Sequence, residues 1–296
     1  MKVNNSKNPI TKYLSSLLKY LATITPALLW MVSFFIIPLL FIVVVSFSTR
    51  GEVGNIVYKF TFSNYSKLLD PLYINIFFKS ILIAIYTTVL CLVLGYPFAF
   101  IIANTNRKFK SILLLLIILP FWTNSLVRTY AMIVLLRTEG IINTVLLHLH
   151  LISTPLHLMY NNTAVMIGML YMMFPFMVLP LYTSIEKLDK RVLDAASDLG
   201  AGPIYKFLKI TLPLTKGGIV SGSILVFIPT LGLFFVTDLM GGSKVTLMSN
   251  LIKNQFLTAR DWPFGSAISV ILIIVMVSVI IYNSRVSGTK GTKEVL

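Results

Sequence analysis

The sequence has little charge and almost no cysteine. Charged residues are 12% of its 296 residues and apolar residues are 56%, whereas soluble domains are roughly one quarter charged. These proportions exclude an ordinary soluble domain and indicate an integral membrane protein. The single cysteine, Cys91, lies within an apolar run, so neither a disulfide framework nor a thiolate metal site is available.

Acidic residues are the scarcer charged class, with 10 Asp and Glu against 25 Lys and Arg, which gives a formal net charge of +15. A charge of this size can indicate nucleic-acid binding. Here the basic residues are scattered between apolar runs and form no continuous patch. Membrane topology explains the charge better, and we expect no nucleic-acid partner.

The motifs of several enzyme classes are also missing from the sequence. The Walker A pattern occurs nowhere, and residues 241–244 lack its spacing. The apolar runs contain no paired carboxylates and no set of nucleophile and base. His148 and His150 are two residues apart, so they do not share a helical face as metal ligands would. We therefore expect no catalytic activity, no metal site and no cofactor in this chain.

Six apolar runs are long enough to cross a bilayer as helices, and they predict an all-α membrane protein in which residues 1–296 form a single domain. The first run is too long for a signal-peptide core and lacks a cleavage site, so it is predicted to be an uncleaved anchor. The basic segment at residues 1–20 suits the membrane interface. The third run is interrupted by Pro120. The predicted spans cover about residues 24–46, 80–103, 111–136, 163–184, 217–237 and 263–282.

The distribution of Lys and Arg predicts the orientation. With the N-terminus inside the cell, sixteen basic residues fall in inside segments and eight in outside segments, while Arg128 lies within a span. This bias places both termini in the cytoplasm, together with the polar interval between the fourth and fifth spans.

That interval, residues 186–213, is the longest charged stretch in the chain, and it predicts two short helices. Asp189 can cap the first helix, and Gly200 stands where a left-handed C-terminal residue is needed. The second helix can begin at Gly202–Pro203 and end at Leu212–Pro213.

The same interval contains Asp194-Ala195-Ala196, then Gly200, and then Ile210, Leu212 and Pro213. This pattern resembles the EAA signature, EAA-x3-G-x9-I-x-LP, of the membrane permeases of ABC importers. Aspartate replaces the glutamate of the signature, which shortens the carboxylate stem by one methylene. The resemblance implies a type I ABC importer permease fold, in which this helix-turn-helix docks into a separate cytoplasmic ATPase dimer and transmits its closure. ATP and Mg²⁺ would then be bound by that partner. We call residues 186–213 the coupling loop.

Further informative stretches lie outside the coupling loop, at residues 63–65, 69–73, 119–130, 237–242 and 260–265. They resemble the permeases of polyamine importers, and most closely the B-type subunits of spermidine/putrescine systems. The resemblance implies an inner-membrane protein that forms half of a polyamine path with a second, similar permease subunit. A periplasmic polyamine-binding protein would deliver the cargo. The open alternatives are another small cargo, such as a metal chelate or an oxyanion, and an ion-coupled secondary transporter, although the two halves show no inverted repeat.

A polyamine path needs carboxylates for the ammonium groups of the cargo and aromatic faces for its methylene stem. Few residues near the predicted spans offer this chemistry. For any single aromatic residue, helix packing or a place in the interfacial belt is the commoner role. The candidates are Trp122, Tyr130, Tyr171, Phe174, Asp238, Asp261 and Trp262.

Arg128 is a separate case, because an arginine inside the membrane would repel a cationic cargo. We expect it to be held by an acidic partner or by carbonyl groups at a helix C-terminus. Asp238 is the nearest acidic candidate by depth. If the two pair, Asp238 becomes a weaker cation site, so the two roles of Asp238 compete.

Overall fold

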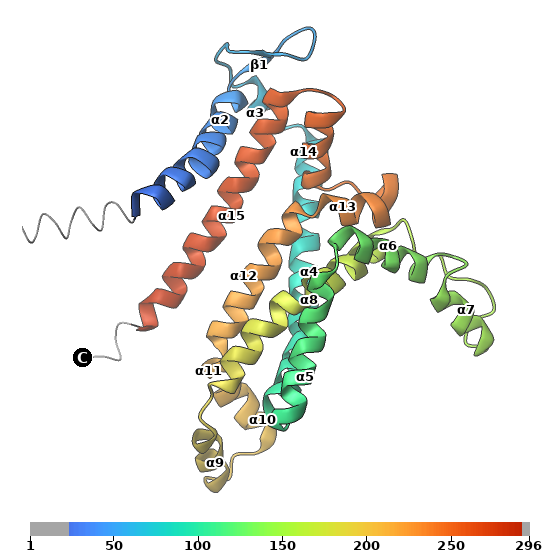
Figure 1. The fold of residues 1–296 in the computed structure, drawn as a ribbon, viewed down its shortest axis with the longest axis vertical. Helices are drawn as coiled ribbons and strands as arrows, with labels where there is room; N and C mark the ends of the chain where they lie inside the picture. Colours follow the sequence, from blue (N-terminus) through green and yellow to red (C-terminus); the bar gives the residue numbers. More distant parts are fainter. Residues whose placement is uncertain (1–23, 292–296) are drawn as a thin grey trace, which may run out of the picture.

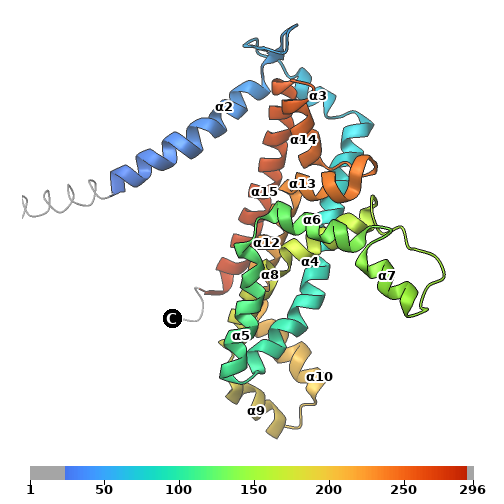
Figure 2. The ribbon, with the colours of Figure 1, turned by 45° about the vertical axis from the view of Figure 1, so that its right-hand side comes forward.

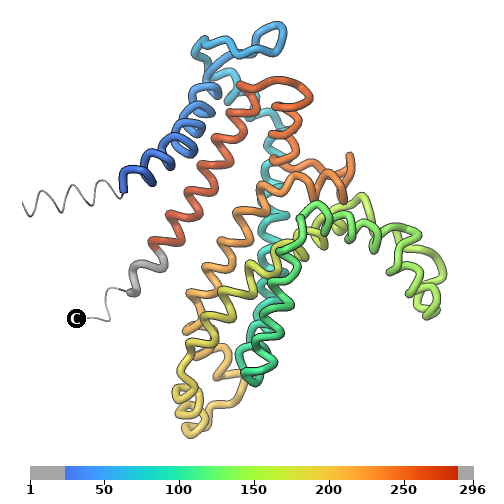
Figure 3. The backbone as a smooth tube through the Cα atoms, in the orientation of Figure 1, coloured from blue at the N-terminus to red at the C-terminus, as the bar shows by residue number. Residues whose placement is uncertain are grey.

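A computed structural model describes residues 24–291 of the chain (Figure 1). The predicted interfacial segment at residues 1–20 lies outside this range. The molecule is elongated, with a small hairpin of two strands, β1 (Thr49–Arg50) and β2 (Ile56–Val57), at one end and two short helices at the other. Between the two ends, long helices run side by side (Figure 3).

Most helical elements follow one another with short connections, but longer segments separate α2 from α3 and α7 from α8. The first helical stretch covers Ile24–Ser46 and contains the π-helical turn η1 (Val32–Ile36) and α2 (Ile37–Ser46). The other elements are α3 (Ser63–Lys67), α4 (Pro71–Asn104), α5 (Arg107–Ile118), η2 (Leu119–Trp122), α6 (Ser125–Leu136), α7 (Ile141–His148), α8 (Asn162–Glu186), α9 (Lys190–Asp198), α10 (Pro203–Lys206), η3 (Phe207–Thr211), α11 (Leu212–Leu214), α12 (Lys216–Gly232), α13 (Phe234–Val236), η4 (Thr237–Gly241), η5 (Gly242–Lys244), α14 (Met248–Leu257) and α15 (Trp262–Gly291).

The centre of the molecule is formed by α4, α8 and α12, which pack on one another. Met169, Met177 and Leu181 of α8 are fully buried there. The approach of α12 to α8 is close: a Cβ atom on Gly218 would lie 2.5 Å from Cβ of Ser184. Small residues at such contacts let membrane helices pack backbone to backbone, which is a main source of their association energy.

Helices α2 and α15 pack against each other beside this centre, and α14 packs on the outer end of α15. Figure 2 shows α2 diverging from the other helices. The most apolar 18-residue window of Ile24–Ser46 is 6% buried, against 56% for that of Asn162–Glu186. The first helix is therefore peripheral, whereas α8 is central.

Among residues 24–291, five helices are long and apolar enough to cross a membrane, and the number is six when a bent pair is counted as one span. The predicted third span, residues 111–136, is not one continuous helix: α5 ends at Ile118, a 3-10 turn contains Pro120, and α6 begins afresh after Asn124. The side chain of Asn124 accepts a hydrogen bond from the backbone N–H of Leu126 (2.8 Å), so the sequence supplies both a helix breaker and a new cap. The long apolar stretch in this part of the chain is instead Ser125–His148.

Candidate functional site

The coupling loop forms the compact end of the molecule that α9 and α10 occupy in Figures 1 and 2. The side chain of Asp189 caps α9 by accepting a hydrogen bond from the backbone N–H of Arg191 (3.0 Å). At the other end of α9, Gly200 has a φ of +81°. The N–H groups of Gly200 and Ala201 donate to the carbonyls of Ser197 and Ala196, both at 2.9 Å, which is the hydrogen-bond pattern of a Schellman motif.

The second half of the loop begins at Gly202 and Pro203, as the sequence predicts, but it does not end at Leu212–Pro213. The helical run continues through the π-helical turn η3 into α11 and stops at Leu214. Pro213 has no N–H to donate, and it closely follows the π-helical turn η3, where the regular α-helical hydrogen bonding is already interrupted. The chain then bends by 65° between Leu214 and Lys216 before α12 begins.

The coupling loop exposes several large apolar side chains among its charged residues. Leu199, between the two short helices, is 88% exposed, and Ile204, Tyr205 and Leu208 are also exposed. Lys206 Nζ donates to Ser197 Oγ (2.7 Å) and holds α10 against α9. Exposed apolar side chains grouped on one rigid projection are typical of a protein-binding surface.

A buried polar contact connects the bend to the helices. The hydroxyl of Tyr96, on α4, lies 2.8 Å from Oγ1 of Thr215, the residue at the bend, and both side chains are buried. The ring of Tyr96 also contacts Phe207 in a T-shaped pair, with ring centroids 5.5 Å apart. Sequence reasoning missed this junction, because Tyr96 and Thr215 are 119 residues apart and neither belongs to a motif.

A second contact fixes the base of the loop. Lys110, near the start of α5, forms an ion pair with Glu186 at the end of α8 (2.9 Å). Ser184 Oγ donates to the carbonyl of Thr215 (3.5 Å). The base of the coupling loop thus contacts α4, α5 and α8 as well as α12.

The structure places Asp238 in η4, where Oδ1 accepts from Nδ2 of Asn250 and Oδ2 accepts from Nζ of Lys253. The predicted pairing of Asp238 with Arg128 is therefore wrong. Lys253 takes this position because α14 folds back against α13, which leads directly into η4. Within the described range no carboxylate pairs with Arg128; its Nε is buried without a hydrogen-bond partner, and its guanidinium lies 5.5 Å from the ring centroid of Phe121.

Asp261 caps the first turn of α15. It is buried, and its Oδ1 accepts from the backbone N–H of Phe264 (3.1 Å), in the first turn of α15. Its other oxygen lies 3.9 Å from Nζ of Lys67.

The five aromatic candidates lie on four elements, η2, α6, α8 and α15. Trp122, Tyr130 and Tyr171 are exposed on different helices. Phe174 packs against Phe98 (centroids 5.7 Å apart) and Trp262 packs against Phe256 (5.5 Å). Their role as a cargo path stays a prediction.

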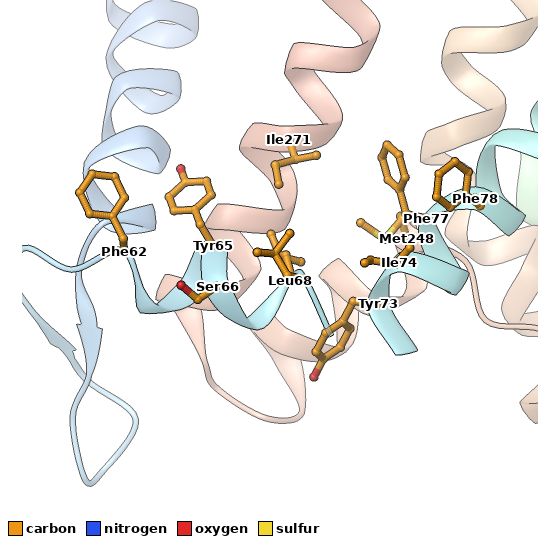
Figure 4. Close-up of a pocket in the computed structure, with 11 residues that line it drawn as sticks. Phe62, Tyr65, Ser66, Leu68, Tyr73, Ile74, Phe77, Phe78, Met248 and Ile271 are labelled. Atoms are coloured by element: carbon orange, nitrogen blue, oxygen red, sulfur yellow. The ribbon is translucent and has the colours of Figure 1, made fainter. Parts of the chain in front are cut away.

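An apolar cavity of about 620 Å³ lies near the hairpin end, between α3, α4, α14 and α15 (Figure 4). None of the candidate cargo residues lines it. Because its lining contains no charged side chain, it lacks the carboxylate that an ammonium group needs. The lining residues are Phe62, Tyr65, Ser66, Leu68, Leu69, Tyr73, Ile74, Phe77, Phe78, Met248 and Ile271.

Residues 95–287, which include the coupling loop and its junction with α4, match the family described as the inner membrane component of binding-protein-dependent transport systems. The chain belongs to this family. It is accordingly a permease component of the inner membrane and crosses that membrane several times. The signature found in the coupling loop is thus part of a match that extends over most of the chain.

Individual relatives agree with the family. The chain is 49% identical to the spermidine/putrescine transport system permease protein PotB of Escherichia coli K12 over 264 residues, which are 89% of this chain and 96% of that protein. It is 44% identical to PotB of Haemophilus influenzae over 89% of this chain and 92% of that protein. The resemblance to spermidine/putrescine permeases is confirmed.

Solved structures agree with the fold. A bacterial ABC transporter involved in the import of alginate superposes with a TM-score of 0.75 at 13% identity, over 96% of this chain and 99% of the other. The same kind of transporter in complex with a periplasmic protein carrying an alginate pentasaccharide gives a TM-score of 0.76. The all-α ABC importer permease fold predicted from the sequence is confirmed.

Proposed function

We propose that this permease imports polyamines of the spermidine/putrescine class across the bacterial inner membrane. It forms half of the path with a second, homologous permease subunit. The observation that carries the proposal is the identity of 49% to a permease named for these two cargoes, over 89% of this chain. Similarity of this extent supports the same substrate class, which the fold alone does not.

The coupling loop is proposed to dock onto a separate cytoplasmic ATPase dimer, which binds ATP and Mg²⁺. The signature residues Asp194, Ala195 and Gly200 lie on or beside α9, where Leu199 supplies an exposed apolar contact. Closure of the ATPase would push on α9 and α10. The Tyr96–Thr215 junction would transmit that movement to α4, and the bend at Thr215 would carry it into α12.

The orientation belongs to the same proposal. The excess of Lys and Arg in these segments supports an orientation with the coupling loop and both termini in the cytoplasm. The end with β1, β2, α3 and α14 then faces the periplasm (Figure 1), where a polyamine-binding protein would release its cargo.

The test is uptake by cells that lack their own polyamine importers. The permease is expressed with a second permease, an ATPase and a binding protein of a spermidine/putrescine system, and radiolabelled spermidine and putrescine are supplied. We expect uptake that requires every component and is competed by unlabelled polyamine. An importer that takes up a metal chelate or an oxyanion but neither polyamine would contradict the cargo. Uptake without the ATPase would contradict the mechanism and favour an ion-coupled transporter.

A further inference from the structure

The carboxylate of Asp238 is held in a fixed position by an amide. Asn250 is buried, and its side chain is fixed by two backbone groups: Nδ2 donates to the carbonyl of Phe234 (3.0 Å) and Oδ1 accepts from the N–H of Leu247 (3.2 Å). The same Nδ2 group donates to Oδ1 of Asp238. One oxygen of the carboxylate is therefore held by a rigid donor that does not depend on any lysine.

The other oxygen, Oδ2, receives the ammonium of Lys253, and an aromatic ring completes the surroundings. Nζ of Lys253 lies 5.9 Å from the ring centroid of Phe234. A carboxylate oxygen and a π face around one –NH₃⁺ group are the two elements that recognise an alkylammonium ion. Lys253 itself is a primary amine on a four-carbon stem, so chemically it resembles one end of a diamine.

We propose that Asp238, Asn250 and Phe234 form an alkylammonium site for one end of the cargo, and that Lys253 is its built-in occupant, which an incoming polyamine displaces. The proposal rests on the proposed polyamine function. The exchange replaces one ammonium by another, so the charge around Asp238 stays the same. After the exchange, the ammonium of Lys253 returns to water.

The exposure of the pair fits an exchangeable contact better than a structural one. The side chains of Lys253 and Asp238 are 29% and 32% exposed, so a solute can reach them. An ion pair that is this open to water contributes little to stability, because water screens it and the flexible lysine loses entropy. Since Asn250 keeps the carboxylate in place, departure of Lys253 leaves a preformed site.

The test is a chemical rescue of the assembled importer, purified in detergent without its binding protein. Lys253→Ala removes the occupant and leaves space for a free amine. Propylammonium chloride is titrated, with sodium chloride at equal ionic strength as the reference, and thermal unfolding is followed. Lys244→Ala is the matched control, because Lys244 is an exposed lysine in η5, between η4 and α14.

We expect propylammonium to raise the unfolding temperature of Lys253→Ala at a concentration roughly tenfold lower than in the parent, since no internal ammonium competes. The Lys244→Ala control should behave like the parent. The double variant Asp238→Asn with Lys253→Ala should show no rescue, because the amide carries no charge.

Equal responses of Lys253→Ala and the parent would overturn the proposal, and so would rescue that persists in the double variant. If Lys253→Ala does not fold, Lys253→Met keeps the apolar stem without the charge, and the same comparison applies. Failure of both variants to fold shows a structural ion pair and also overturns the proposal. Propylammonium is not the cargo, so its effect on unfolding tests the site alone. The proposed function is tested separately, by the uptake of spermidine into cells that carry the parent importer.

Discussion

Gly200 and Gly202 stand close together in the coupling loop but under different constraints. Gly200 has a φ of +81°, whereas Gly202 has a φ of −69°, which any residue adopts. A Cβ atom at either position would meet nothing within 4 Å. The need for glycine at position 200 is therefore a matter of backbone conformation and not of space.

This difference predicts unequal effects of alanine. Gly200→Ala should destabilise the turn after α9 by roughly 1–2 kcal/mol, because an L-residue is strained in the left-handed region. Gly202→Ala should cost less than half of that. The measurement is ATPase stimulation in the assembled importer, which we expect to fall in the first variant and to persist in the second. Equal activity of the two variants would show that the left-handed turn is not needed for coupling.

The hydroxyl of Tyr96 makes a specific hydrogen bond to Thr215. Oγ1 of Thr215 donates to the carbonyl of Thr211 (2.8 Å), so the tyrosine hydroxyl acts as the donor in its contact with Thr215. Tyr96→Phe removes that hydrogen bond, worth about 1 kcal/mol, while the ring keeps its contact with Phe207.

We expect the Tyr96→Phe importer to fold and to hydrolyse ATP but to transport less cargo per ATP, because the bend is held less firmly to α4. Uptake and hydrolysis are measured together in proteoliposomes. Tyr86→Phe is the control, since Tyr86 lies exposed on the same helix. An unchanged ratio of uptake to hydrolysis in Tyr96→Phe would remove this junction from the mechanism.

At the scale of the elements, the close packing of α12 on α8 depends on the small size of Gly218. At Gly218 a Cβ atom would lie 2.5 Å from Cβ of Ser184 and 2.8 Å from the carbonyl oxygen of Pro180, whereas at Gly217 it would meet nothing within 4 Å. The two glycines are adjacent in the sequence, but only one faces the neighbouring helix.

Gly218→Ala should therefore push α12 away from α8 and destabilise the protein by roughly 1–3 kcal/mol, the usual cost of overpacking. Gly217→Ala should be neutral or slightly stabilising, since alanine favours a helix. The measurement is the unfolding temperature of each variant in detergent, compared with that of the parent protein. Similar unfolding temperatures would show that the two helices separate without cost.

The sequence predicted those elements whose signals are local. The helix cap at Asp189 and the turn at Gly200 each depend only on neighbouring residues. The membrane spans are indicated by long apolar runs. The break of the third span also has local signals, Pro120 and the cap at Asn124. The extension of α11 beyond Pro213 depends instead on how the chain continues its hydrogen bonds around a proline. The pairing of Asp238 with Lys253 instead of Arg128 depends on α14 folding back against α13, which no local pattern indicates.

At the scale of the whole molecule, the two ends should be separated by the membrane. Val53 in the strand hairpin and Leu199 in the coupling loop are 89% and 88% exposed in this chain, so a cysteine at either site is open to a reagent when the permease is labelled without its ATPase partner. The native Cys91 is buried. The parent chain therefore serves as an unlabelled background.

We expect a membrane-impermeant maleimide to label Val53→Cys in intact spheroplasts, and to label Leu199→Cys only in inverted vesicles. Uptake assays should be run alongside, to show that both variants assemble. Labelling of Leu199→Cys from outside would show the opposite orientation. The coupling loop would then have no access to a cytoplasmic ATPase.

The shallow burial of the first helix also has a consequence for how the protein is made. The window within Ile24–Ser46 is only 6% buried by the rest of the chain, so its insertion depends on lipid and hardly on helices that the ribosome has not yet produced. During synthesis this helix can therefore anchor the chain in the bilayer before the later helices are made. The central helix α8 emerges later and reaches its final environment only after α12 has followed it.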